Sequence, residues 1–337
     1  MLGNLGMALA NPGQTPVELV VEGSTTVTPI AEGCAYDIGL LTDDVDIALT
    51  GTGSGSGIAA LIAGSVDIAM ASRAMKDSEK LELPNWNEEV VAADGIAIIV
   101  HPNNPVENLT LDELEDIYDG NVSNWNEVGG SDQAISVVNR DASSGTRGFF
   151  HEFVLNEMPF RSDQITEQPS NGGVHDYVAA NEWAIGYVGL GFLDTEVQAL
   201  GIGPEPTAVM PSVETVADNS YPIARNLYMY TDGAPTGFAK VFIEYIQSAL
   251  GQAIVAEEDF VPIGPVAFRP EELDEEPVDD DSTDDDSTDD DSTNTTDDDS
   301  TNTTDDDSDT DGIPGYTPLA VLAISMITAV LLMRKRK

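Results

Sequence analysis

The sequence predicts a mixed α/β fold in which mostly parallel β-sheets are flanked by helices. Between residues 17 and 270, short apolar runs rich in Val and Ile alternate with segments of helical periodicity. Loops of Gly, Ser and Thr follow several of these runs, as functional loops do at the carboxyl ends of parallel strands. The chain has 337 residues, which is enough for two lobes of ordinary domain size.

The predicted elements follow one another in a strand–helix order. Segments that are short, apolar and bounded by Gly, Asp or Asn predict strands at 17–23, 45–51, 66–72, 95–100 and 134–139. Segments with the longer apolar spacing of buried or amphipathic helices predict helices at 29–41, 57–64, 109–120 and 148–158. This alternation favours parallel strands joined by helical crossovers.

The chain is strongly acidic, with a formal net charge of −48. Residues 271–312 contain 22 acidic side chains and no basic one, and residues 1–270 still contain 39 acidic against 9 basic side chains. Such a surface disfavours nucleic acid as a partner. We interpret the acidity as an adaptation to high salt, where dense carboxylates keep the surface hydrated; simple solubility is the alternative interpretation.

Few residues offer metal-binding or redox chemistry. The single cysteine, Cys34, has no partner for an intrachain disulfide, and we expect it to be a small core residue. The histidines His101, His151 and His175 lack a metal-ligand spacing such as HExxH. We therefore expect no metal site and no cofactor.

Four polar loops are the main functional signal in the sequence. They are GSTT at 23–26, GTGSGSG at 51–57, ASR at 71–73 and RDASSGTR at 140–147, and each follows a predicted strand. Backbone N–H groups at helix starts, hydroxyls and an arginine fork are the donors that a tetrahedral oxyanion needs. GTGSGSG lacks the Lys-Ser/Thr ending of a nucleotide-binding loop, and its GSGSG has no evident triad partners. These loops predict an oxyanion-binding protein that is not an enzyme.

Several longer motifs strengthen this prediction by their combination and order. They are VEGSTTVTPIAEG, GTGSGSGIAALIAGSVDIAMASR, LEDIYDGNVSNWNEVGG, RDASSGTRGFFHEFVL, SNGGVHDYVAANEWAIGYVGL and YPIARNLYMYT. Over about residues 17–268, the chain resembles the phosphate-binding proteins of high-affinity phosphate ABC transporters. The resemblance implies a two-lobed periplasmic-binding-protein fold of type II, with inorganic phosphate in the interlobe cleft and ABC permease subunits as partners of a monomer.

The resemblance also implies a set of phosphate ligands at matching motif positions. These residues are Ser24, Thr25, Thr26, Ser54, Ser72, Arg140, Ser144, Gly145 and Thr146. The third loop departs from the best-known pattern, because Arg73 stands where an aspartate would accept the phosphate proton. Asp141 is the nearest alternative acceptor in sequence, although pairing with Arg140 or Arg147 is the simpler role for it. Arg147 is expected to support the loop from the following helix.

Three other functions stay open at this point. The missing aspartate leaves another oxyanion as ligand, such as sulfate, molybdate or tungstate. A phosphatase-type hydrolase would need a nucleophile–base pair or a metal cluster, and the sequence offers neither. A sensor that binds phosphate without a permease cannot be separated from a transport receptor by the residues alone.

The predicted organisation has six parts. They are an N-terminal segment at 1–16, which is either a signal-peptide remnant or an ordinary disordered terminus, the first part of lobe 1 at 17–100, lobe 2 at 101–222, the second part of lobe 1 at 223–270, an acidic disordered spacer at 271–312, and a C-terminal membrane anchor or sorting signal at 313–337. The crossovers are expected near 95–102 and 221–229.

The C-terminal end predicts attachment to the cell membrane. An uncharged apolar run at 318–333 precedes RKRK, which would keep that end in the cytoplasm and the lobes outside the cell. Pro314-Gly315-Tyr316 resembles the Pro-Gly-Phe motif of archaeal C-terminal sorting signals, with Tyr in place of Phe. The helix is therefore expected either to stay as an anchor or to be replaced by a lipid.

Overall fold

The computed structural model describes residues 15–163 and 165–264. The predicted acidic spacer, the C-terminal anchor and nearly all of the N-terminal segment lie outside the described residues. In chain order the elements are β1 (Val17–Gly23), α1 (Thr28–Leu41), β2 (Val45–Gly51), α2 (Ser54–Ile62), β3 (Ile68–Ala71), α3 (Asp77–Glu82), β4 (Trp86–Val100), β5 (Asn108–Leu109), α4 (Leu111–Asp119), η1 (Trp125–Val128), β6 (Ser136–Arg140), α5 (Gly145–Phe153), β7 (Ile165–Gln168), α6 (Asn171–Ala180), β8 (Ala184–Gly189), η2 (Leu190–Phe192), β9 (Gln198–Ala199), β10 (Gly201–Ile202), α7 (Val213–Ala217), β11 (Ala224–Asp232), α8 (Gly237–Gln247) and α9 (Ala249–Glu257).

Within these residues, a nine-stranded sheet runs in the order β2-β1-β3-β11-β4-β8-β6-β7, and β9 pairs with β4 beside this path. β1 is parallel to β2 and β3, and β6 is parallel to β7 and β8. β11 and β8 are both antiparallel to β4. Residues 86–95 of β4 pair with β11, and residues 96–100 pair with β8. The long strand β4 therefore joins two groups of mostly parallel strands.

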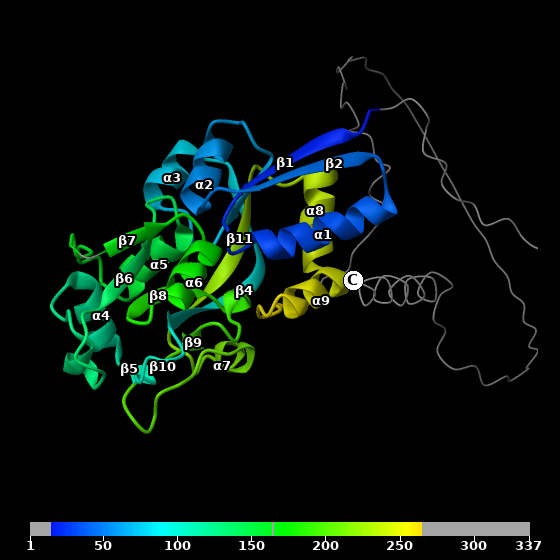
Figure 1. Cartoon of the computed structure of the whole chain (residues 1–337). Coiled ribbons are helices and arrows are strands. Elements are labelled where there is room, and N and C mark those ends of the chain that lie inside the picture. The colour runs from blue at the N-terminus through cyan, green and yellow to red at the C-terminus, as the bar shows by residue number, and fades with distance from the viewer. Residues whose placement is uncertain (1–14, 164, 265–337) are drawn as a thin grey trace, which may run out of the picture. The chain divides into compact units, whose positions relative to one another are not determined.

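These two groups are the two lobes of the fold (Figure 1). Lobe 1 contains β1, β2, β3 and β11, with α1 packed on β2 and α2 on β1 and β3, while α8 and α9 lie against α1. Lobe 2 contains β6, β7 and β8, with α5 and α6 packed on this side of the sheet. The two-lobed α/β architecture expected from the sequence is confirmed, whereas the residue boundaries drawn at 100 and 222 stay predictions.

Most predicted elements are present, with shifted ends. The strands expected at 17–23 and 45–51 match β1 and β2, but the strand expected at 95–100 is only the end of β4. The helix expected at 148–158 is α5, which begins at Gly145 and ends at Phe153. It stops early because Asn156 and Glu157 have φ values of 47° and 65°, which no right-handed helix contains.

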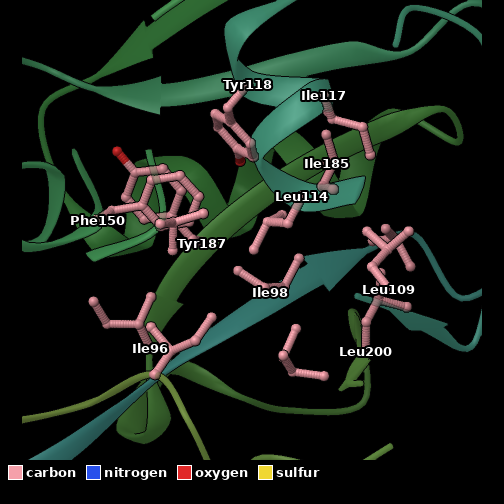
Figure 2. Close-up of a cluster of buried hydrophobic side chains, with 14 of the residues drawn as sticks. Ile96, Ile98, Leu109, Leu114, Ile117, Tyr118, Phe150, Ile185, Tyr187 and Leu200 are labelled. Carbon is pink, nitrogen blue, oxygen red and sulfur yellow. The ribbon is translucent and has the colours of Figure 1, made fainter. Parts of the chain in front are cut away.

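The core of lobe 2 directly supports the chain that leads into the RDASSGTR loop. Figure 2 shows the rings of Phe150 and Tyr187 face to face, with Tyr118 beside them; the Phe150–Tyr187 ring centroids are 4.3 Å apart. The Tyr187 hydroxyl donates to Asn139 Oδ1 and lies 3.5 Å from the backbone N–H of Arg140. The stacked aromatic cluster thus fixes the end of β6.

In lobe 1, Cys34 is fully buried in the core, as predicted.

Polar side chains cap the helices that begin next to these strand ends. Thr110 and Glu113 form a reciprocal capping box at α4, with the Thr110 hydroxyl accepting from the Glu113 N–H at 3.2 Å. Ser144 caps α5 by accepting from the Arg147 N–H, and Ser170 caps α6 by accepting from the Gly173 N–H.

No helix within residues 15–163 and 165–264 is long and apolar enough to cross a membrane.

A histidine ties α6 to the loop after η2. His175 Nε2 lies 2.9 Å from Asp194 Oδ1, and Nδ1 lies 3.2 Å from Asp176 Oδ1. Desolvation alone would lower the pKa of His175, but the hydrogen bonds to Asp194 and Asp176 outweigh it, so the pKa is raised. Glu196 brings a third ligand-type atom to within 4.8 Å of this group. Both ring nitrogens of His175 therefore have a carboxylate partner, and these contacts join α6 to the loop after η2.

Gly57 sets how closely α2 packs on β1. A Cβ at this position would lie 2.5 Å from the carbonyl oxygen of Glu22 and 2.6 Å from Gly23 Cα, just before the GSTT loop. We predict that Gly57→Ala destabilises the protein by about 1–3 kcal/mol, because the backbone must shift to make room. Chemical denaturation measures this change.

Gly39 in α1 is the matched control, since a Cβ there would meet nothing within 4 Å. Gly39→Ala should leave the protein equally stable or stabilise it by up to about 1 kcal/mol. Equal losses of stability in the two variants would show that the packing of α2 on β1 is not the constraint.

The raised pKa of His175 predicts a pH-dependent contribution to stability. The contribution is fully present below the unfolded-state pKa of about 6.5 and is lost as pH rises through the higher folded-state pKa. His175→Gln should therefore melt below the wild type at mildly acidic pH, and the gap should close at alkaline pH. Thermal melts across this range measure the gap, and a constant difference would contradict the ion-pair role.

Candidate functional site

The predicted loops meet where the two lobes face each other. Thr26, from the GSTT loop before α1, lies beside Thr146 of α5, with 3.3 Å between the two hydroxyl oxygens. Ser54, the first residue of α2, lies 3.3 Å from Ser72, oxygen to oxygen, and also accepts from the Ser72 N–H. Residues far apart in the chain thus bring their hydroxyls together at the starts of α1, α2 and α5.

Gly145 is needed at the point where α5 approaches lobe 1. A Cβ on this residue would overlap Ser54 Oγ and lie 2.7 Å from Ser72 Oγ. The neighbouring loops are also joined directly: the Gly55 N–H donates to the Ser143 carbonyl at 2.8 Å, and Ser143 Oγ lies 3.1 Å from the Thr52 carbonyl oxygen. The α5 N-terminus is therefore held against the α2 N-terminus.

Nearly all the predicted site residues are buried, which excludes bulk water from their polar atoms. Thr25 is half-buried and Gly145 is buried. The others are at most 3% exposed: Ser24, Thr26, Ser54, Ser72, Arg140, Ser144 and Thr146. Two of the hydroxyls also support turns, since Ser24 Oγ accepts from the Thr26 N–H and Ser144 caps α5.

Arg140 reaches from the end of β6 to lobe 1. Its Nη2 donates to Thr25 Oγ1 at 3.1 Å and to the Pro169 carbonyl at 3.0 Å, and its Nε donates to the Gln168 carbonyl. Its buried Nη1 has no hydrogen-bond partner among the described residues. Burial lowers the pKa of Arg140 to about 10, so the guanidinium remains charged at neutral pH. An unsatisfied, charged donor in a dry setting is suited to an anion.

A second arginine, which was not among the predicted site residues, also contacts the hydroxyls of the site. Arg225 of β11 donates from Nη2 to Thr146 Oγ1 at 3.0 Å and to Thr26 Oγ1 at 3.4 Å. Its Nη1 donates to the Ser72 carbonyl at 2.9 Å. Its carboxylate partner is Asp94 of β4, 2.8 Å away and fully buried.

Removal from water raises the pKa of Asp94 and lowers the pKa of Arg225, and their mutual attraction works against both shifts. The other carboxylate oxygen of Asp94 accepts from the Leu190 N–H at 3.0 Å. The pair therefore joins β4, β11 and η2 directly behind the hydroxyls.

Asn171, the first residue of α6, was also missed. Its side-chain N–H group donates to Thr26 Oγ1 at 3.0 Å and to Thr25 Oγ1 at 3.3 Å, and its Oδ1 accepts from the Gly189 N–H. The SNGG stretch follows β7 as the other polar loops follow their strands, and this position was the available signal.

Arg73, Asp141 and Arg147 lie around the site rather than among the converging hydroxyls. Arg73 makes a two-pronged ion pair with Glu79 at 2.7 and 2.8 Å, away from Ser72. The Asp141 carboxylate accepts from the N–H and hydroxyl of Ser143. Its negative charge also acts to raise the pKa of Arg140 against the effect of burial, so its pairing with an arginine stays a prediction. Arg147 donates to the Arg140 carbonyl at 2.9 Å, in line with the expected supporting role.

The arrangement is rich in donors. Two guanidinium groups, an amide, several hydroxyls and the N-termini of α1, α2, α5 and α6 converge, and the buried Asp94 carboxylate is already bonded to Arg225. Helix N-termini and charged forks stabilise negative charge, and glycine allows the backbone to approach. The geometry therefore suits a small, tetrahedral, negatively charged ligand.

Comparison with known proteins agrees with this description. The model of the PBP superfamily domain matches residues 10–249. The phosphate-binding protein PstS of Bacillus subtilis is 34% identical over 247 residues, which is 73% of this chain and 80% of that protein. PstS of Borreliella burgdorferi is 32% identical over 253 residues, covering 72% of this chain and 89% of the relative.

Solved structures give the same result. A putative phosphate ABC transporter substrate-binding protein from Clostridium perfringens, with bound phosphate, is 36% identical with a TM-score of 0.68, covering 73% of this chain and 99% of that one. An ABC-type phosphate transport receptor from Vibrio cholerae is 31% identical with a TM-score of 0.61, at the same coverage. This chain therefore belongs to the PBP superfamily and, within it, to the family of PstS phosphate-binding proteins.

Proposed function

We propose that this chain is an extracytoplasmic receptor that binds inorganic phosphate and delivers it to the permease subunits of an ABC importer. The observation that carries the proposal is Arg140, whose buried, charged guanidinium keeps one nitrogen without a hydrogen-bond partner in the part of the chain that the structure describes. Leaving such a donor unsatisfied costs free energy, and an oxyanion supplies the missing acceptor. The PstS names of the relatives indicate which oxyanion.

The proposed ligand set is the one expected from the sequence. Ser and Thr hydroxyls contribute one donor each, and backbone N–H groups at the starts of α2 and α5 contribute without side chains. The residues are Ser24, Thr25, Thr26, Ser54, Ser72, Arg140, Ser144, Gly145 and Thr146. Most of the donors are neutral, so only Arg140 in this set brings a formal charge to the ligand.

Binding rather than catalysis is the proposed role, in keeping with relatives whose names describe binding and transport. Ser143, the hydroxyl that could be suspected as a nucleophile, is held by Asp141 and the Thr52 carbonyl. Its proton is therefore directed to groups that position the loop.

The Arg140 proposal gives a direct test. Isothermal titration of the wild type should show one phosphate per chain with a micromolar or lower Kd, about −8 kcal/mol or more favourable. Arg140→Ala should weaken binding by about 2–5 kcal/mol, because a charge-assisted, buried contact is lost.

Arg147→Ala is the matched control, since Arg147 contacts the Arg140 carbonyl and the half-exposed Glu167. It should lower the melting temperature slightly and affect phosphate binding much less than Arg140→Ala. Equal losses of binding in both variants would overturn this division of roles. If sulfate or molybdate bound the wild type more tightly than phosphate, the ligand assignment would be wrong.

We further propose that residues 271–312 act as a spacer and that residues 313–337 attach the protein to the membrane, with the lobes outside the cell. The support is the sequence: the acidic Asp-Ser-Thr repeats, the apolar run 318–333 and the basic RKRK end.

A chain truncated after residue 270 should stay in the soluble fraction and bind phosphate with the affinity of the full chain. The reason is that the proposed ligands all lie between residues 24 and 146. Fractionation of cells expressing each form, followed by titration in molar salt, measures both properties. Loss of binding on truncation would show that the tail belongs to the site.

A further inference from the structure

The site contains a buried ion pair that the proposed ligand set does not include. Asp94 is fully buried and Arg225 is 6% exposed. Burying two charges is costly, and a pair of well-packed apolar residues often stabilises a fold as well or better. The directions in which Arg225 donates suggest a purpose beyond holding β4 against β11.

Arg225 donates to the two hydroxyls that meet across the lobes. Its Nη2 is 3.0 Å from Thr146 Oγ1 and 3.4 Å from Thr26 Oγ1. A guanidinium has no acceptor, so each threonine oxygen must accept in these contacts. Asn171 also donates to Thr26, at 3.0 Å. Each hydroxyl has only one proton, and that proton must then point away from Arg225.

Asp94 fixes the guanidinium in this orientation. One carboxylate oxygen accepts from both Nε and Nη2 of Arg225, at 3.1 and 2.8 Å, and the other accepts from the Leu190 N–H. The Ser72 carbonyl holds Nη1 at 2.9 Å. Every nitrogen of the fork therefore has a partner, and rotation of Arg225 would break several contacts together.

We propose that Arg225, held by Asp94, is a positioning residue that turns the hydroxyl protons of Thr26 and Thr146 away from itself. Since at most one of these protons can lie between the two oxygens, which are 3.3 Å apart, the pair directs at least one donor to the bound oxyanion. The inference rests on the proposed function and adds a preference within it. A fixed donor favours an oxyanion whose facing oxygen carries no proton. The site then binds the doubly charged form of phosphate better than the singly charged form.

This preference predicts a pH profile. Total phosphate should bind more tightly as pH rises through its second ionisation near neutrality, whereas sulfate, which stays doubly charged, should show little change. Within the described residues, the ionisable groups that act on Arg140, Arg225 and Asp94, besides one another, include no histidine. They are Asp141, Tyr187, Tyr221 and Tyr228. If Asp94 changed its protonation state near neutral pH, sulfate binding would also change with pH. Titration with sulfate therefore distinguishes ionisation of phosphate from ionisation of Asp94.

The main test is Arg225→Lys, titrated with phosphate and with sulfate across neutral pH. The ammonium keeps the positive charge beside Asp94 but lacks the planar fork needed to hold both threonines and the Ser72 carbonyl. Phosphate Kd should rise by roughly tenfold to a hundredfold. The pH profile should also flatten, because the threonine hydroxyls can then rotate and accept a phosphate proton.

Arg161→Lys is the matched control. Arg161 is a buried arginine of lobe 2 that donates to the Asp163, Ile117 and Val122 carbonyls. Within residues 15–163 and 165–264, none of its hydrogen bonds or ion pairs involves a residue of the site. The Arg161→Lys variant should be less stable, as any buried Arg→Lys change can make a protein. Its phosphate Kd and the pH profile of that Kd should stay unchanged. A wild-type Kd and profile in Arg225→Lys would overturn the proposal, as would equal losses of binding in both lysine variants.

A second variant covers the case in which Arg225→Lys fails to fold. Asp94→Asn combined with Arg225→Gln removes both charges together, so no unpaired charge is left buried. It should bind phosphate weakly with a flattened pH profile, and a wild-type profile would contradict the positioning role. If the wild type binds sulfate but not phosphate, the proposed function fails. The sulfate Kd of these variants then decides the inference, which survives only if their binding is weakened.

Discussion

The buried contact between Asp94 and Arg225 is the interaction on which the geometry of the site depends. It lies where the long strand β4 passes from one group of strands to the other, and Arg225 comes from the strand that pairs with the first part of β4. Through one guanidinium, the carbonyl after β3, the loop before α1 and the first turn of α5 are held in register. A buried charge that has lost its partner is strongly unfavourable, so Asp94 and Arg225 each require the other.

The use of positive charge follows the same logic across the molecule. Four of the five arginines within the described residues are buried, namely Arg73, Arg140, Arg161 and Arg225, whereas the described lysines are exposed or half-buried. The chain therefore places its scarce guanidinium groups where water is excluded and an ionic contact is strongest. An acidic surface repels an anion over long distances, but at molar salt screening acts within about 3 Å, so the local donors determine binding.

The sequence allowed the loops of the site to be predicted, but not the pair behind them. GSTT, GTGSGSG and RDASSGTR each combine glycine and hydroxyls after an apolar strand, a local pattern with a local physical cause. Asp94 and Arg225 are separated by 131 positions and lie inside strands, where only the three-dimensional pairing shows that they meet. The first half of β4 was missed because its acidic residues hide the strand pattern. The interpretation of the acidity as adaptation to high salt is not tested by these contacts.

The backbone hydrogen bond from Gly55 to Ser143 has a consequence for how ligand preference can change during evolution. It joins the two loops through main-chain atoms alone, at 2.8 Å, and therefore does not depend on which hydroxyl or amide side chains contact the anion, as long as Gly53 and Gly145 keep the backbones close. A lineage can exchange the hydroxyls and amides that contact the anion while the loops keep their alignment. Ligand selectivity can then change by single substitutions, while the contact between the GTGSGSG and RDASSGTR loops stays the same.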